Sequence, residues 1–252
     1  MREWLDEAVV LRMGHFREAD LWLRLLCRGR GALTLVAFGA SRSRRRLCGC
    51  LDVFNTLHCR VRVSSRGDFL NLEEAALLRG PRDLRADWRR MGLATNCLRF
   101  LEALGVDGEC AAESFALLED LREMLEVGRA VPQLLPLFFR LRLAGALGFA
   151  PNLGRCGVCG AEVGEKASFV VDEGLLLCPR CRAARALAET RYCVDISRRG
   201  LDVLRAVQQS FPSAWPAEPL PAAERRACAR VIDGFVQYHL GLAWENGYFR
   251  RV

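Results

Sequence analysis

Residues 9–37 read VVLRMGHFREADLWLRLLCRGRGALTLVA, and apolar side chains recur in this stretch at every second position. Such alternation predicts strands, because successive side chains of a strand point to opposite faces of a sheet. Turns at Gly14 and at 29–31 divide the stretch into three strands, and 57–63 and 70–72 add two more. Five short strands without intervening helices predict a closed barrel of the OB-fold type, with an open meander as the alternative.

The same alternation predicts which side chains fill the barrel. The expected core consists of Val9, Leu11, Met13, Leu21, Leu23, Leu25, Leu33, Leu35, Ala37, Leu57, Cys59, Val61, Val63, Leu70 and Leu72. A helical turn is expected around 47–51, between the third and the fourth strand.

The pattern changes at Pro81, which cannot continue a central strand. Beyond it the apolar residues recur at helical spacing, so we expect a boundary near residue 80 between two domains, 1–80 and 81–252. Helices are expected over 83–104, 113–126, 132–147, 197–209 and 222–244.

The third expected helix is apolar on nearly every side, except at Arg140 and Arg142. A helix of this kind is typical of the middle of a bundle. Pro132 fits its first turn and Gly148 its end, while Ser197 is the expected N-cap of the fourth helix.

Four cysteines stand in two pairs, Cys156 with Cys159 and Cys178 with Cys181, and eighteen residues separate the pairs. Each Cys-x2-Cys turn aims two thiolates at one point, and a hairpin between the pairs brings the turns together. Four thiolates complete a tetrahedral shell and leave no position for a substrate or an activated water. The spacing therefore predicts a structural zinc site, with buried thiols that bind no metal as the alternative.

These elements together predict an α+β protein. An N-terminal five-stranded OB-fold β-barrel is followed by an all-helical domain, which carries the inserted four-cysteine zinc module at about 153–184.

The composition predicts a cytoplasmic protein with a polyanionic partner. The N-terminal residues are too charged for a signal peptide, and no apolar run is long enough to span a bilayer. In a reducing compartment the eight cysteines outside the two pairs are expected to act as small buried hydrophobes. The net charge of +7 and the pI near 9.0 favour nucleic acid or another acidic partner.

A basic loop, SRSRRR at 41–46, follows the third strand. Guanidinium groups and serine hydroxyls suit phosphate oxygens, and the loops of OB barrels border nucleic-acid grooves. The expected DNA-binding residues are Arg42, Arg44, Arg45 and Arg46 in this loop and Arg24, Arg60 and Arg62 at outward strand positions, beside His58. A solvated run of charges is the alternative. Trp22 and Phe69 also point away from the expected core, where they either stack on bases or pack against the helical domain.

Recognisable catalytic residues are missing from the sequence. His15, His58 and His239 lie far apart without a nucleophile or a ligand motif, and Glu18 and Asp20 face no identified cleft. Glycine-rich phosphate loops are also missing. We therefore expect a binding protein and not an enzyme.

Several stretches resemble the RecO family of bacterial recombination mediators. The opening strands, Glu-x-Asp turn and basic loop of that family resemble VVLRMGHFREADLWLRLLCRGRGALTLVAFGASRSRRRLCGCLDVF at 9–54. The more specific match is LFFRLRLAGALGFAPNLGRCGVCG at 137–160, followed by GLLLCPRC at 174–181. A weaker match is YHLGLAWENGYF at 238–249, and the stretch 183–221 is the least diagnostic part of the chain.

The resemblance implies an OB-fold, a central helical domain and, in many members, a four-cysteine zinc site. It also implies binding of single- and double-stranded DNA and annealing of complementary strands. The implied partners are RecR and the acidic C-terminal tail of single-stranded-DNA-binding protein, with which such proteins help to load recombinase onto coated strands. The implied location is the cytoplasm, at the nucleoid when the protein is engaged.

By motif, the resemblance carries over to the four cysteines and to Arg42, Arg44, Arg45 and Arg46 only. Arginine stands here at basic positions where the family often has lysine, which keeps the charge but changes the geometry of phosphate contacts. Two other functions fit the same residues. One is a zinc-containing RNA-binding or RNA-processing factor, and the other is an adaptor whose basic surface binds acidic protein tails.

Overall fold

The structure, a computed structural model, describes residues 3–43, 45–47, 49–126, 128, 130–185 and 192–252. The chain forms two compact units, one of 1–91 with 105–127 and the other of 92–104 with 128–252. The expected division into domains near residue 80 stays a prediction.

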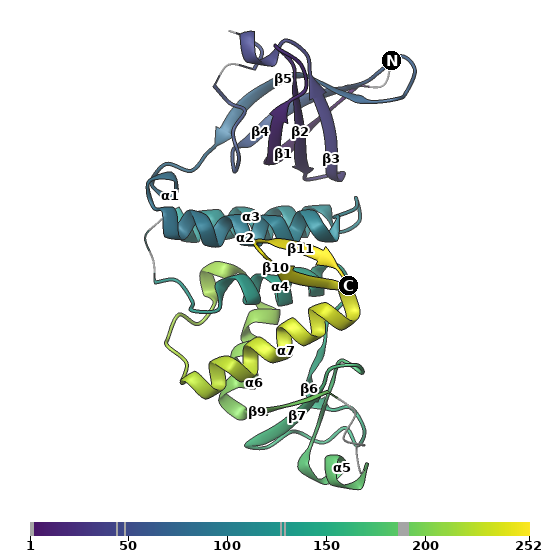
Figure 1. The fold of residues 1–252 in the computed structure, drawn as a ribbon, viewed down its shortest axis with the longest axis vertical. Coiled ribbons are helices and arrows are strands. Elements are labelled where there is room, and N and C mark those ends of the chain that lie inside the picture. The colour runs from purple at the N-terminus through teal and green to yellow at the C-terminus, as the bar shows by residue number, and fades with distance from the viewer. Residues whose placement is uncertain (1–2, 44, 48, 127, 129, 186–191) are drawn as a thin grey trace. The chain divides into compact units, whose positions relative to one another are not determined.

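A closed barrel forms the first unit's sheet, as Figure 1 shows. Its strands are β1 (Glu3–His15), β2 (Leu21–Cys27), β3 (Gly31–Ala37), β4 (Thr56–Val63) and β5 (Leu70–Arg79). They are hydrogen-bonded in the order β1-β2-β3-β5-β4, so β1 has β2 on one edge and β4 on the other. All neighbours are antiparallel except β3 and β5. The five predicted strands are therefore confirmed, and the barrel is closed.

The barrel core differs from its prediction in β1. Ala8 and Val10 lie in the core, whereas Val9 and Leu11 are buried outside it. An irregularity in the pairing with β2, between Val10 and Arg12, changes the phase of the strand. An extra residue at such a bulge moves the following side chains to the other face, so that Met13 again packs against the core.

Most other predicted core residues are confirmed. The core includes Leu21, Leu23, Leu25, Leu35, Ala37, Leu57, Cys59, Val61 and Leu72, with Leu33 and Leu70 partly buried against it, while Val63 is half-buried outside the cluster.

The helical turn predicted around 47–51 is wrong for the described residues of that stretch. A short 3-10 helix forms earlier instead, at Ala40–Arg42. Leu47 and Cys50 both face the barrel core, and the Arg46 carbonyl accepts a hydrogen bond from the backbone N–H of Ala75 at 3.0 Å. Residues 49 and 50 form a turn in which Gly49 has a left-handed φ of 66°, so this turn is not helical.

Helix α3 (Ala111–Glu126) is joined to the barrel through Glu119. The carboxylate accepts hydrogen bonds from the Thr56 hydroxyl on β4 at 2.6 Å and from Arg79 Nε on β5 at 2.7 Å. Arg122, one turn along the helix, adds a third contact at 3.3 Å. Burial opposes ionisation of this carboxyl, but the bonds from Thr56, Arg79 and Arg122 outweigh it and hold the pKa of Glu119 below its usual value.

Glu119→Gln should lower the free energy of unfolding by about 2 kcal/mol at pH 7, because hydrogen bonds to a charged group are lost. A carboxyl with a depressed pKa stabilises the fold above its unfolded pKa of about 4.3 and loses that contribution at lower pH. The difference between the two proteins should therefore shrink below about pH 4.3. Urea unfolding at pH 7 and pH 3.5 measures it, with the exposed Glu123→Gln on the same helix as control. A difference that is equal at both pH values contradicts the assignment.

The second unit is built on helices. Its principal helices are α4 (Leu135–Ala146), α6 (Arg198–Gln209) and α7 (Ala222–Leu240), and most of α2 (Trp88–Leu104) also belongs to it. Helix α4 contacts both α6 and α7, which confirms its predicted place in the middle of the bundle. It begins at Leu135 and not at Pro132, because Pro136 takes the first-turn position. None of the described helices combines the length and apolar character needed to cross a bilayer.

The last predicted helix is too long. Helix α7 ends at Leu240, and the next residues form a hairpin of β10 (Leu242–Glu245) and β11 (Tyr248–Arg251). Its turn is Asn246-Gly247, with φ of 49° and 86°, the pair of residues that favours a tight hairpin turn. The prediction of helix up to Trp244 is therefore wrong, and the helical part of the chain also carries strands.

Candidate functional site

The cysteine module is a small sheet with one short helix. Its strands are β6 (Asn152–Cys156), β7 (Lys166–Val170), β8 (Leu175–Leu177) and β9 (Cys193–Ser197), in the order β6-β8-β7-β9, and its helix is α5 (Pro179–Ala184). Figure 1 shows this sheet in the second unit, where β8 lies between β6 and β7, and β9 is the other neighbour of β7. The described strands of this sheet lie between residues 152 and 197, and the range of 153–184 for the zinc module stays a prediction.

Each cysteine pair lies where a strand or helix of the module begins or ends. Cys156 ends β6 and Cys159 lies in the turn after it, whereas Cys178 is the N-cap of α5 and Cys181 lies in its first turns. The backbone N–H of Gly157 donates to the carbonyl of Leu176 at 2.8 Å, which ties the first turn to the strand that leads into the second pair. The two turns are therefore held side by side.

The four sulfur atoms gather at one point. All of them lie within 4.8 Å of one another, and the Sγ atoms of Cys159 and Cys178 are 3.9 Å apart. Four sulfurs at about 2.3 Å from a central zinc ion would be about 3.8 Å from each other. The residues present therefore fit a tetrahedral metal ion.

The backbone favours a thiolate at one of these sulfurs. Burial opposes ionisation of Cys156, but backbone N–H groups of Cys159, Cys178 and Val158 lower its pKa to about 6. The pKa of Cys181 rises to about 12, first because its thiol shares a hydrogen bond with Cys159 and then through burial and the neighbouring thiols. Ionising four adjacent thiols is costly because the negative charges of the thiolates repel one another. A divalent metal ion would compensate these charges.

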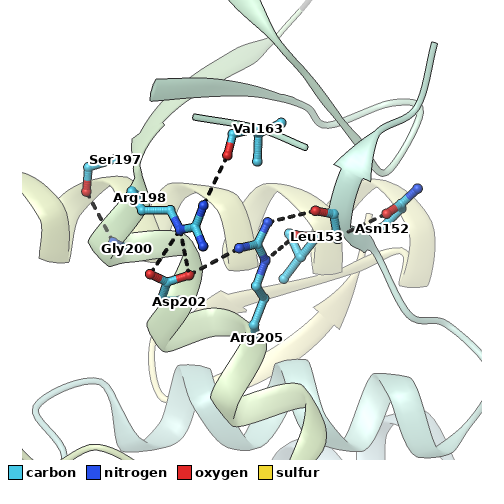
Figure 2. Close-up of polar contacts among 9 residues, drawn as sticks. Asn152, Leu153, Val163, Ser197, Arg198, Gly200, Asp202 and Arg205 are labelled. Atoms are coloured by element: carbon cyan, nitrogen blue, oxygen red, sulfur yellow. Dashed lines mark hydrogen bonds and ion pairs between the residues drawn. The ribbon is translucent and has the colours of Figure 1, made fainter. Parts of the chain in front are cut away.

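Helix α6 braces the segments before and after the first cysteine pair, and Figure 2 shows the contacts of its two arginines. Arg205 donates to the carbonyl of Leu153 at 2.6 Å and of Gly154 at 2.8 Å, just before Cys156. Arg198 donates to the carbonyl of Val163, after Cys159, at 3.3 Å. Asp202 lies between the two arginines and contacts each at 3.1 Å. Ser197 caps this helix as predicted, because its hydroxyl accepts the N–H of Gly200 at 3.1 Å.

A second polar group holds the other cysteine pair. Arg182 on α5 donates to the hydroxyl of the buried Ser168 at 2.5 Å and pairs with Asp195 on β9. Ser168 donates to the same carboxylate at 2.7 Å. Both cysteine turns are therefore fixed from outside, which is typical of a preformed structural metal site and not of an open catalytic one.

The described cysteines outside the cluster agree in large part with the prediction of small buried residues. Buried examples are Cys27, Cys50, Cys59, Cys97 and Cys228, while Cys110 and Cys193 are half-buried. Cys48 lies outside the described residues.

The basic loop is anchored by the turn between β1 and β2. Asp20 accepts the backbone N–H of Gly39 at 2.8 Å, and Glu18 pairs with Arg42 at 2.6 Å. The two carboxylates thus contact the beginning of the loop.

The predicted arginines of the loop are distributed along the barrel. Arg45 and Arg46 are exposed and line an open hollow of about 380 Å³, together with Leu5, His58, Arg60, Glu74, Ala75 and Ala76. Arg44 lies outside the described residues.

Arg60 and Arg62 on β4 are paired with carboxylates. Arg60 contacts Glu3 at 3.4 Å and Glu74 at 3.5 Å, and Arg62 contacts Glu3 at 3.6 Å and Glu73 at 3.4 Å. Three glutamates therefore compensate the charge of two arginines. Their attraction for a phosphate chain is reduced, although their positions on the outer surface agree with the sequence.

Arg24 lies apart from these two residues. It is on β2, which flanks the opposite edge of β1 from β4, and its guanidinium donates to the Thr34 hydroxyl at 3.0 Å. Trp22 and Phe69 lie in the same part of the barrel, with two further residues that sequence reasoning missed. Arg12 lies over the ring of Trp22, 5.4 Å from its centroid, and Phe38 packs edge to face against Phe69 at 5.7 Å. The period-two pattern could have found Arg12, since it alternates with Met13.

Comparison with known proteins assigns both parts of the chain consistently. Residues 1–81 match the family described as Recombination protein O N terminal, and residues 85–246 match Recombination protein O C terminal. DNA repair protein RecO of Nitratidesulfovibrio vulgaris (strain DP4) is 49% identical over 99% of this chain and 100% of the relative. Proteins of the same name from Oleidesulfovibrio alaskensis and Lawsonia intracellularis are 41% and 38% identical, each over 99% of this chain and 100% of the relative.

Proposed function

Because the chain belongs to the RecO family of DNA repair proteins, we propose that it is a recombination mediator that binds single- and double-stranded DNA. It anneals complementary strands and, with RecR, helps to load recombinase onto strands coated by single-stranded-DNA-binding protein. This work requires binding and alignment of polymers and no covalent step, so the protein is not an enzyme.

The observation that carries DNA binding is the exposed basic loop beside the open hollow of the barrel. Arg45 and Arg46 line this hollow, and the loop is fixed at its start by Glu18 and Asp20. Positive groups fixed around a concave surface attract a phosphate backbone, in keeping with the net charge of +7. We assign DNA binding to the barrel domain at 1–80, with Arg42, Arg44, Arg45 and Arg46 as the principal contacts and Arg24, Arg60 and Arg62 as further ones.

The metal of the cysteine module is proposed to be zinc with a structural role. The tetrahedral fit of four sulfurs and the bracing of both cysteine turns support this assignment. Cys156, Cys159, Cys178 and Cys181 would hold the ion, which would stabilise the module in the helical domain at 81–252.

The protein partners follow from the family. RecR and the acidic C-terminal tail of single-stranded-DNA-binding protein are the proposed partners, and a cytoplasmic location at the nucleoid is the proposed site of action. The basic character of the chain favours an acidic tail. No residues are assigned to either contact.

Replacing Arg42, Arg44, Arg45 and Arg46 together by alanine should flatten the salt dependence of DNA binding. Each lost contact with a single strand should reduce the slope of log affinity against log salt by about 0.7, because fewer counterions are released. Fluorescence anisotropy of a labelled single strand between low and moderate salt measures the slope.

The matched control is the double variant Arg60→Ala with Arg62→Ala. Glutamates already compensate the charge of these two arginines. The slope should therefore change by less than about 0.7 per arginine removed. An unchanged slope in the loop variant contradicts the loop assignment. Tighter binding of an RNA strand than of the matching DNA strand contradicts DNA as the partner and favours an RNA-processing factor.

A further inference from the structure

The outer surface of β1, β2 and β3 combines aromatic rings with arginines. The residues of this aromatic face are Arg12, Gly14, Trp22, Arg24, Thr34 and Val36 on the strands, with Phe38 after β3 and Phe69 before β5. Their neighbours Leu23, Leu25 and Leu35 fill the barrel core, so the strand members point outward. The pairing places Trp22 between Gly14 and Val36, and Arg24 between Arg12 and Thr34.

Gly14 makes room for the indole of Trp22. A Cβ at position 14 would lie 2.6 Å from Nε1 and 2.8 Å from Cε2 of the ring, so the indole occupies the space of a side chain. A glycine inside a strand weakens the sheet and often marks a close approach of this kind. The guanidinium of Arg12 lies over the same ring. The ring is therefore held against β1 on the outer surface of the barrel.

Phe38 and Phe69 extend the aromatic surface. Their side chains are 36% and 42% exposed, although both are large and apolar. They contact each other edge to face, with an angle of 72° between the rings. Phe38 follows Val36, the partner of Trp22, by two residues and lies in the turn just beyond the end of β3. The face thus offers more than one stacking surface.

The charge of this face also differs from that of the β4 surface. Neither β2 nor β3 contains an acidic residue. Within the described residues, Arg24 and Arg12 form no ion pair with a carboxylate, whereas Arg60 and Arg62 pair with glutamates. Uncompensated arginines beside exposed rings are the combination that binds a single strand, with phosphates on the cations and bases on the rings.

We propose that the aromatic face binds the unpaired bases of single-stranded DNA. Bases stack on Trp22 and on the pair of Phe38 and Phe69, while Arg12 and Arg24 contact the neighbouring phosphates. This inference rests on the proposed function and adds a surface that distinguishes single-stranded from double-stranded DNA. Paired bases are stacked inside the duplex and cannot reach the rings, so the face selects single strands.

The test compares Trp22→Ala with the unchanged protein on three labelled ligands at one salt concentration. These are an oligothymidine, an abasic strand of the same length, and a duplex. Loss of stacking should weaken binding of the oligothymidine about tenfold, which lies within the range that one stacked base contributes. Binding of the abasic strand and of the duplex should stay the same, because neither offers an unpaired base. Anisotropy measures all three affinities.

Control variants separate stacking from folding. Trp22→Phe keeps a ring and should retain most of the affinity, whereas Gly14→Ala displaces the indole and should weaken oligothymidine binding without removing a ring. Trp88→Ala removes a 76% exposed tryptophan at the start of α2 and should change nothing. Phe69→Ser, at an exposed side chain, provides the same test if Trp22→Ala proves unstable.

The outcomes distinguish this inference from the proposed function. Equal loss on the oligothymidine and the abasic strand, or no loss on either, overturns the stacking face and leaves DNA binding by the basic loop intact. If the unchanged protein binds none of the three ligands in dilute salt, the proposed function itself fails.

Discussion

Cys178→Ser should unfold the cysteine module and abolish binding of the proposed zinc ion. In small metal-binding peptides the ion contributes on the order of 10 kcal/mol of folding free energy, so the loss of one of four ligands removes most of what holds the module. The sheet of the module is small, and its strand β8 has only three residues. The contacts of Arg205 and Arg182 position the two cysteine turns, but the ion would supply the bonds that join the four sulfurs directly.

Two measurements check this result. Native mass spectrometry should find one zinc ion in the unchanged protein and none in Cys178→Ser. Thermal unfolding followed by circular dichroism should show a lower midpoint in the variant, and a chelator should have the same effect on the unchanged protein. Cys193→Ser is the matched control, because Cys193 lies on β9 of the same sheet but outside the cluster. An unchanged midpoint and metal content in Cys178→Ser contradicts the metal site.

The sequence predicts the barrel well because every second side chain of its strands is apolar and faces the same core. It misses the shift in β1, where the bulge between Val10 and Arg12 exchanges the two faces of the strand. No glycine or proline marks that point, and the bulge depends on the pairing with β2. The hairpin at the C-terminal end was within reach of sequence reasoning, since Asn246-Gly247 is a strong turn pair. The helical spacing of apolar residues in α7 continues to Leu242, so the sequence analysis extended the helix into the hairpin.

The candidate site was predictable only where its members are close in sequence. The spacing of two Cys-x2-Cys pairs predicts that four sulfurs meet, and they do. The brace from Arg205 to Leu153 joins residues 52 positions apart and depends on helix packing. The same limit explains why the sequence does not reveal that Arg60 and Arg62 are paired with glutamates. Their glutamate partners lie on β1 and β5, and only the strand register shows that the basic strip is compensated.

Arg140 on α4 shows the same limit of sequence analysis, because its partners lie far away in the sequence and only helix packing brings them together. Arg140 is 6% exposed, and its guanidinium donates to Asp233 on α7 at 2.7 Å and to Asn96 on α2 at 3.2 Å. The rings of Phe249 and Trp244 lie 4.9 and 5.8 Å from it. Burial lowers the pKa of Arg140 and raises that of Asp233, while their ion pair opposes both changes. One buried cation thus joins two helices and the C-terminal hairpin.

Arg140→Met should therefore lower the free energy of unfolding by about 2 kcal/mol, because it removes a hydrogen bond to a charged group and leaves Asn96 and the exposed Asp233 without their donor. Arg142→Met, two residues away, is the matched control. That side chain is only half-buried, donates to the carbonyl of Ser210 at 3.3 Å and lies over the ring of Phe211, so its loss should cost less than the loss of the buried Arg140. Arg140→Lys should not restore stability, since an ammonium cannot bond both partners in the geometry of a guanidinium. Urea unfolding followed by tryptophan fluorescence compares the midpoints, and equal losses at the two positions contradict a central role for Arg140.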